Sequence, residues 1–435
     1  MGRYTFVAPS NEHLPAVLLD RCYVSGFDQY PMPSRADIHE GTLIVQCEPP
    51  IAGRVTVPYC IEGRGTLMLT TATLIPSELP KILPLELVRG LLGRLKNQVD
   101  AWANRGASLP NELLHKLKEV GQRFRQAISL MHEDVARSSE IADQCLEQTL
   151  QLADAIVDQY VRQYHQRHRV GWLATDARQV DFDWRESAES WLAWCHLAWP
   201  EITASADRNW PQVPDMELPE SDKLVHDHAA LIGPLVDLTA DNLPTALRHL
   251  TATDHSVSQI CQQLTSQAIR HYHGQAAQWY VRASMRAATS LRLSETDKLQ
   301  TVADIIQIIR HLDNHTPLCV LFTEPWCDFL RTGEMEVSSL RFAEALARAE
   351  IGVTGFGLDL TIGSGSGAMI PRDPLAFDQL LAAWSQFNLP LVLFLGWNQS
   401  AAEWCSADMA MEYSHRYLTW ARTFSSVEGV VWTQP

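Results

Sequence analysis

Three carboxylate residues follow short apolar runs in the second half of the chain. Asp237 lies in the run PLVDL, Glu324 follows LFT, and Asp359 lies in GFGLDL. Two carboxyl groups that face the same small volume can divide general acid, general base and nucleophilic roles between them. A single carboxylate after a strand can equally cap a helix or form a structural hydrogen bond. The chemistry therefore depends on whether the fold brings these side chains together.

Apolar runs of strand length alternate with helical patterns from residue 169 to residue 435. Helices are expected over Glu295–Arg310, Ser339–Ala349 and Asp373–Gln386. Runs that are apolar throughout are typical of parallel strands buried on both faces, and eight of them begin near Val170, Trp191, Ala229, Gln278, Pro317, Thr354, Leu389 and Glu428. This pattern predicts an α/β fold, a closed (β/α)8 TIM barrel, whose chemistry would lie where the strands end.

Two further regions precede the barrel. Residues 1–80 contain short runs rich in β-branched and aromatic residues, separated by Gly and Pro, which predict a small β-sandwich domain. Residues 81–168 have helical periodicity, with Leu87, Leu91 and Leu95 on one face and a second stripe from Leu113 to Met131. They predict a helical hairpin or a three-helix layer. The stripes would pack on neighbouring elements or form a surface for a protein partner or self-association, and the sequence leaves both open.

The charge balance and the cysteines limit the classes of partner. Acidic residues outnumber basic ones by 51 to 35, and a negative surface field repels nucleic acid and anionic lipid. We therefore expect no nucleic-acid partner. No apolar run is long enough to span a bilayer, so we also expect no membrane association. The nine cysteines are scattered without a CxxC pair, and the first residues lack a secretory pattern. We therefore expect a cytoplasmic protein with free thiols.

Several barrel segments resemble, in order, motifs of glycoside hydrolase family 10, the xylanase family. They are WPEI with NWPQVPDM, QWYV, TGFGLDLT, NLPLVLFLGW and EGVVW, which are similar to the family's second, fourth, sixth, seventh and closing strands. The match runs from Val170 to Trp432 and implies the family's barrel and a β-linked polysaccharide as ligand. The order of a β-domain, a helical segment and such a barrel also resembles a group of uncharacterised bacterial proteins.

The resemblance places the family's acid/base glutamate on Ser284 and its nucleophile on Leu395. The glutamine and histidine of the sixth strand become Asp359 and Thr361. Retaining hydrolysis needs two carboxyl groups about 5 to 5.5 Å apart, one to protonate the leaving oxygen and one to attack the sugar. Serine and leucine supply neither group, so the family's mechanism cannot operate with these residues.

Three interpretations follow from this loss. The first is a carbohydrate-associated pseudoenzyme that binds a neutral oligo- or polysaccharide, since aromatic planes stack on sugar faces. Its binding residues would be Trp199, Asp237, Trp326, Trp397, Asn398 and Trp432. The second is an active O-glycosyl hydrolase in which Glu324 and Asp359, on neighbouring strands, form a relocated catalytic pair. The third is an intracellular scaffold whose helical segment binds a protein partner.

Two His-x-His pairs and a glycine-rich segment have residue types that also occur in metal or phosphate sites. His226 and His228 would lie before the third strand, at the wrong end of the barrel for catalysis, while His271 and His273 lie at a helix end, where the dipole favours positive charge. The GSGSG segment at 363–367 does not run directly into a helix and has no Lys, unlike phosphate-binding loops. We therefore expect no metal and no cofactor, and interpret GSGSG as a lid over the barrel mouth or a spacer.

Overall fold

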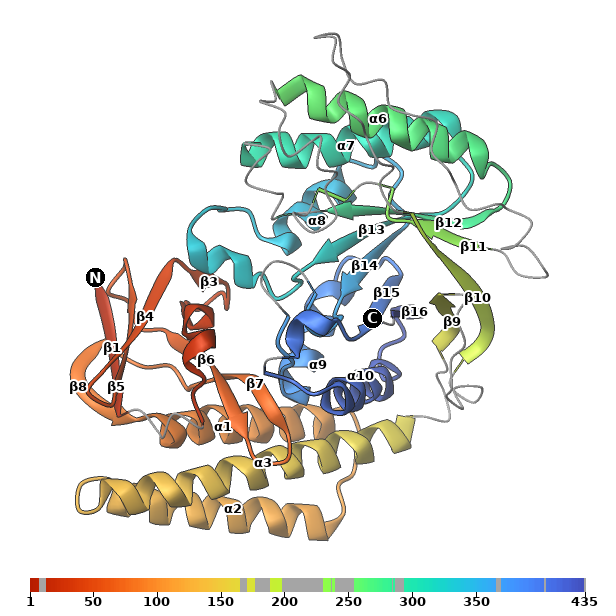
Figure 1. Cartoon of the computed structure of the whole chain (residues 1–435). Helices are drawn as coiled ribbons and strands as arrows, with labels where there is room; N and C mark the ends of the chain where they lie inside the picture. The colour runs from red at the N-terminus through yellow and green to blue at the C-terminus, as the bar shows by residue number, and fades with distance from the viewer. Residues whose placement is uncertain are drawn as a thin grey trace.

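The computed structural model describes residues 1–7, 13–164, 170–176, 188–197, 230–235, 237–238, 254–283, 285, 293–364, 369–402 and 404–433. An N-terminal β-domain, red to orange in Figure 1, lies beside a barrel, and three long helices run beneath both. The predicted fold class, a (β/α)8 barrel preceded by β-sheets and a helical segment, is confirmed. Within the described ranges, no helix has both the length and the apolar character needed to cross a bilayer.

The β-domain consists of two four-stranded sheets, in the orders β4-β5-β1-β8 and β3-β2-β6-β7. The strands are β1 (Gly2–Val7), β2 (Tyr23–Ser25), β3 (Pro31–Met32), β4 (Ser34–His39), β5 (Thr42–Cys47), β6 (Arg54–Ile61), β7 (Gly65–Thr70) and β8 (Ser77–Ile82), with a 3-10 turn η1 (Ala16–Arg21). Glu40 and Gly41 join β4 to β5 with φ angles of 48° and 74°, the left-handed conformation that a tight two-residue hairpin requires.

Three helices follow the β-domain, namely α1 (Leu83–Asn104), α2 (Asn111–Leu130) and α3 (Val135–Tyr164). The predicted apolar face of α1 is buried. A Cβ atom at Gly90 would come within about 2.6 Å of the backbone at the end of β7, so this glycine allows α1 to lie directly on the β-domain. The stripe on α2 is only partly covered, with Ile128 40% exposed, because α2 lies at the outer side and packs mainly on α3 (Figure 1).

Each of the eight predicted runs forms a strand of one closed parallel barrel, in chain order from β9 to β16. The strands are β9 (Val170–Asp176), β10 (Ala188–His196), β11 (Ala230–Gly233), β12 (Ala276–Ala283), β13 (Leu318–Thr323), β14 (Gly355–Asp359), β15 (Leu391–Gly396) and β16 (Val427–Thr433). The helices of this region are α6 (Asp254–His271), α7 (Glu295–Leu312), α8 (Ser339–Arg348), α9 (Pro374–Ser385) and α10 (Ala407–Ala421), with 3-10 turns η3 (Asp328–Thr332) and η4 (Gln399–Ala401). The caps follow from the sequence, since Ser294, Ser338, Asp373 and Ser406 each accept a hydrogen bond from the first helical turn.

Polar contacts join the three parts. Asp154 of α3 accepts from Arg64 at 2.6 Å and from Arg416 of α10 at 2.7 Å, so one carboxylate connects the β-domain, the helical segment and the barrel. The N–H of Met68 in β7 donates to the carbonyl of Pro371 at 2.9 Å. The β-domain therefore packs against the segment that follows β14, on the side where the barrel strands end.

Candidate functional site

Two aspartates and an arginine meet at the carboxyl end of the barrel. Asp237 lies after β11, Arg282 is the next-to-last residue of β12, and Asp359 ends β14. Arg282 Nη1 donates to Asp237 Oδ2 at 3.0 Å, and its Nη2 lies 3.6 Å from Asp359 Oδ2. The aspartate side chains are 4% and 6% exposed and that of Arg282 17%. These three residues, called here the mouth triad, are largely removed from water, so each charge depends on the others.

Strand alternation places Arg282 inside the barrel. Tyr280 belongs to the inner cluster of side chains and Val281 to the outer one, so Arg282 points inward, one layer nearer the mouth than Tyr280. The ring of Tyr280 makes edge contacts with Trp194 and Phe394, at centroid distances of 5.1 and 5.5 Å. An aromatic layer therefore fills the barrel beneath the mouth triad.

Hydroxyl groups surround Asp359. Its Oδ1 accepts from the N–H of Thr361 at 3.1 Å and from the hydroxyl of Ser364 at 3.4 Å. The hydroxyls of Thr361 and Thr433 lie 3.0 Å apart, and Thr433 also donates to the carbonyl of Leu395. Hydroxyls and carboxylates can together accept and donate hydrogen bonds, so this end of the barrel suits a ligand rich in hydroxyl groups.

Arg282 was not among the residues that the sequence predicted for the site. The signal was present, because a charged residue at an inward position of the apolar strand AAQWYVRA needs a buried partner. What the strand pattern could not supply was the identity of that partner, since Asp237 is 45 residues away along the chain.

Leu395, the position onto which the resemblance places the nucleophile, points away from the barrel interior. It is buried in the outer cluster, whereas its neighbour Phe394 lies in the inner one. The whole of β15, LVLFLG, contains no carboxylate. Ser284 and Trp199 lie outside the described residues.

Glu324 and Trp326 lie where the barrel meets the β-domain. Glu324 lines a small cavity of about 20 Å³ together with Arg21 of the β-domain. The guanidinium of Arg372 stacks over Trp326, with its Cζ 5.0 Å from the centroid of the indole ring. Asp359 is bonded within the barrel, so the structure places the two members of the predicted Glu324 and Asp359 pair in different surroundings.

The remaining predicted residues follow β15 or lie in β16. Trp397 and Asn398 directly follow β15, and Trp397 is half-buried with its Nε1 lacking a hydrogen-bond partner among the described atoms. Asn398 is exposed. Trp432 is buried in the outer cluster, 5.5 Å from His415 of α10, because β16 directs Val431 into the barrel. Trp397 and Asn398 therefore lie beyond the carboxyl end of β15, where Trp397 packs against the outer cluster, and Trp432 faces the helices.

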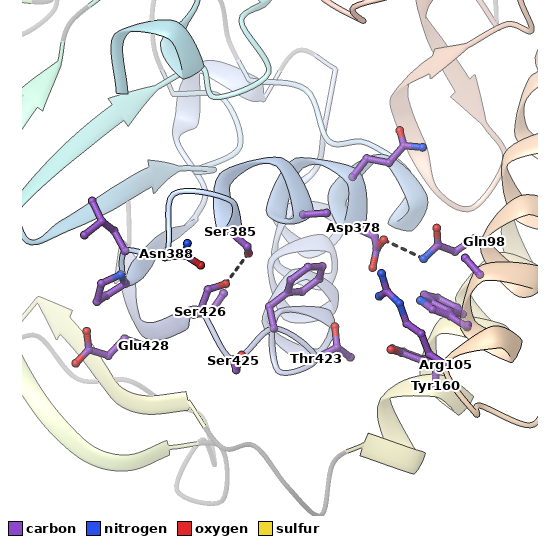
Figure 2. Close-up of a pocket in the computed structure, with 18 of the residues that line it drawn as sticks. Gln98, Arg105, Tyr160, Asp378, Ser385, Asn388, Thr423, Ser425, Ser426 and Glu428 are labelled. Atoms are coloured by element: carbon purple, nitrogen blue, oxygen red, sulfur yellow. Dashed lines mark hydrogen bonds between the residues drawn. The ribbon is translucent and has the colours of Figure 1, made fainter. Parts of the chain in front are cut away.

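A cavity of about 900 Å³ lies at the opposite, amino end of the barrel strands (Figure 2). Strand starts and the helical segment line it, with residues that include Gly171, Pro390, Glu428, Trp102 and Tyr160. Gln98 Nε2 donates to Asp378 Oδ2 at 3.0 Å on one wall. Burial raises the pKa of Asp378 to about 6, although the positive charge of Arg105 and the Gln98 hydrogen bond act in the opposite direction.

The described histidine pair, His271 and His273, is exposed. His271 ends α6 and makes an edge contact with Tyr272, and His226 and His228 lie outside the described residues. Within the part of the chain that the structure describes, no three His, Cys, Asp or Glu side chains form a group able to hold a metal ion.

The chain is similar to solved structures of glycoside hydrolase family 10 xylanases. Xylanase 10B from Thermotoga petrophila, in complex with xylobiose, has 11% identity and a TM-score of 0.41 over 66% of this chain and 85% of that chain. Native xylanase 10B from Thermotoga maritima has 11% identity and a TM-score of 0.41 over 64% and 84%. An endoxylanase from a sugarcane soil metagenome has 12% identity and a TM-score of 0.41 over 62% and 86%.

The resemblance to this family that the sequence predicts is thus found again among solved structures. At these identities and TM-scores it says nothing about site residues or substrate. No family model and no curated protein matches the chain.

Proposed function

We propose that this chain binds a neutral, β-linked glycan at the carboxyl end of its barrel and does not cleave it by the retaining two-carboxylate mechanism. The observation that carries the proposal is that Arg282 forms ion pairs with Asp237 and Asp359 there. A guanidinium pairs with ionised carboxylates, which accept hydrogen bonds from sugar hydroxyls but hold no proton for a leaving group. The β-linked class follows from the resemblance of the barrel segments to the xylanase family.

The two residues that follow β15 would supply a second kind of contact. Trp397 is half-buried at the end of β15, and an indole face offers apolar area to a sugar ring at little cost in ordering. The adjacent Asn398 is exposed and can both donate and accept hydrogen bonds. A polar interior beside a half-buried tryptophan is an arrangement that suits a neutral oligosaccharide.

Proton NMR with xylo-, cello- and manno-oligosaccharides tests the proposal in one experiment. We expect saturation transfer to at least one oligosaccharide that stays intact over hours. Trp397→Ala should weaken its affinity by about 1 to 3 kcal/mol if the ring is a central contact. Phe27→Ala, which removes a fully exposed aromatic side chain of the β-domain, should leave the affinity unchanged. The absence of saturation transfer to every oligosaccharide would refute the proposal.

The same spectra test the two alternatives. New anomeric signals would indicate a glycosidase with relocated carboxylates, and Glu324→Gln should then abolish turnover while the fold is kept. A scaffold that binds a protein through the helical segment would show no saturation transfer, and its partner would be lost when the exposed apolar residue Ile128 of α2 is changed to Lys.

A further inference from the structure

A second polar cavity, of about 420 Å³, lies between the β-domain and the barrel. Its walls come from β2, β6 and α1, from the segment after β13, and from α9 with the residues before it. Three arginines line it, namely Arg54, Arg94 and Arg372. It is called here the interdomain cavity, and its lining includes no member of the mouth triad.

Arg372 is the most deeply buried of the three arginines, with 6% of the residue exposed. Its Nη2 donates to the hydroxyl of Tyr23 at 2.8 Å and to Asp328 Oδ1 at 2.5 Å. The Nε of Arg372 and the Nε1 of Trp326, which also lines the cavity, are buried without a hydrogen-bond partner among the described atoms. Buried donors without acceptors cost free energy, so this wall of the cavity is polar and not fully satisfied by hydrogen bonds.

Arg94 and Arg372 each have a carboxylate partner. Arg94 forms a two-pronged pair with Asp373, at 2.9 and 3.3 Å, and Asp373 also caps α9. Arg372 is paired with Asp328 through a single contact, from its Nη2 to Asp328 Oδ1. These two arginines are therefore neutralised by the protein itself.

Arg54 differs, because no carboxylate of the described chain pairs with it. It is half-buried, and burial and the nearby positive charge of Arg94 both lower its pKa. Asp28 lines the same cavity, but it is exposed and its Oδ1 accepts from the N–H of Tyr30 at 3.2 Å. A partly desolvated guanidinium beside a second one is stabilised when an anion enters.

We infer that the interdomain cavity binds a small hydroxylated oxyanion, a sugar acid or a sugar phosphate, whose carboxylate or phosphate pairs with Arg54. The cavity has a volume typical of small-molecule sites. Amide side chains that can bond to ligand hydroxyls line the rest of it, namely Gln29, Gln379 and Gln386. Because this site and the proposed glycan site share no residue, either proposal can fail without the other.

Isothermal titration calorimetry of the full chain tests the inference with glucuronate, glucose 6-phosphate and inorganic phosphate, and with glucose as the neutral comparison. We expect at least one of the anions to bind more tightly than glucose. Arg54→Gln should weaken that binding at least tenfold, and Arg54→Lys should weaken it less because the charge is kept. Since Arg54 pairs with no carboxylate in the described chain, Arg54→Gln leaves no buried anion behind and should fold.

The control is Arg35→Gln, which makes the same charge change at an exposed position of β4 and should keep the affinity. Binding of glucuronate but not of the phosphates identifies a carboxylate site, and the reverse identifies a phosphate site. The inference is overturned if none of the three anions binds more tightly than glucose, or if Arg54→Gln and Arg35→Gln have the same effect on affinity.

Discussion

The two ends of the barrel bury acidic side chains by different means. At the carboxyl end, Asp237 and Asp359 both bond to Arg282. At the amino end, Asp378 accepts from Gln98, an uncharged amide, and burial raises its pKa to about 6. At the first end a direct ion pair compensates the buried negative charge. At the second end the positive charge of Arg105 and the Gln98 hydrogen bond do not offset the effect of burial, so the carboxyl group takes up a proton more readily. The stability of the carboxyl end should therefore depend on an intact ion pair, whereas the stability of the amino end should depend on pH.

Cavity size alone would direct attention to the amino end of the barrel. The cavity of about 900 Å³ lies at the amino ends of the strands. In barrels of this type, residues at that end serve mainly stability, whereas catalytic and binding groups lie where the strands end. The mouth triad occupies that second end. The comparison therefore predicts that changes at the mouth alter ion pairing and ligand binding, and that changes at the amino end alter the pH dependence of stability.

The largest effect is expected from Arg282→Met, which removes the only positive charge of the mouth triad and keeps a similar apolar stem. Two buried carboxylates would then lie close together without a counter-charge, so we expect a loss of about 3 to 5 kcal/mol in the free energy of unfolding. Equilibrium urea unfolding measures this loss. Arg282→Lys keeps the charge and should lose less.

Arg35→Met, at an exposed position of β4, is the matched control and should change the free energy of unfolding by no more than about 0.5 kcal/mol. Equal unfolding midpoints for Arg282→Met and the wild type would mean that the ion pairs of the mouth triad do not contribute to the stability of the fold. The contrast between the two ends would then have no basis.

The next effect concerns Asp378→Asn at the amino end. The folded-state pKa of about 6 lies above the ordinary value of 3.8, so the folded chain binds the proton more tightly. The free energy of unfolding therefore falls as the pH rises from 4 to 6, by at most about 3 kcal/mol. Asp378→Asn removes this titration, so the variant should be more stable than the wild type at pH 7.5 and should gain little at pH 4.5.

Urea unfolding of both proteins at the two pH values checks this prediction, because other titrating groups cancel in the difference between them. Asp100→Asn, on the exposed side of α1, is the control and should give parallel curves. Parallel curves for Asp378→Asn as well would contradict the picture of a titrating amino end.

The fold could be predicted from local patterns, because each barrel strand is an apolar run bounded by polar residues. VGWLATD and VEGVVWT, the first and last strands, are apolar enough to be recognised and pair with each other to close the barrel. The helices with clear caps were predicted to within two residues, as α7 (Glu295–Leu312) shows. Period and capping are short-range properties, so the sequence carries them directly.

The site was harder to predict, because it depends on side-chain direction and on contacts far apart in the chain. Trp432 ends an apolar run, but strand alternation directs it to the helices. Trp326 follows β13, but the docking of the β-domain places it against Arg372. The raised pKa of Asp378 arises in a wall shared with Gln98, 280 residues away. Neither strand runs nor motif spacing contain these facts.

The smallest effect is expected from Gln98→Leu, which removes the amide that donates to Asp378 Oδ2 at 3.0 Å. This hydrogen bond lowers the pKa of Asp378 against the effect of burial, so its loss should raise that pKa further. The variant should lose about 1 kcal/mol of stability at pH 7.5, where the carboxylate is charged, and less at pH 4.5, where it is protonated. Urea unfolding at the two pH values measures the difference.

The double variant Gln98→Leu with Asp378→Asn completes this test, because an asparagine at 378 cannot titrate. In that background the cost of Gln98→Leu should be the same at pH 7.5 and pH 4.5. A cost that changes with pH only when Asp378 is present means that Gln98 acts on the titration of this one carboxyl group. A cost that is independent of pH in both backgrounds would mean that Gln98 acts through packing, and that the two ends do not differ in how they compensate buried charge.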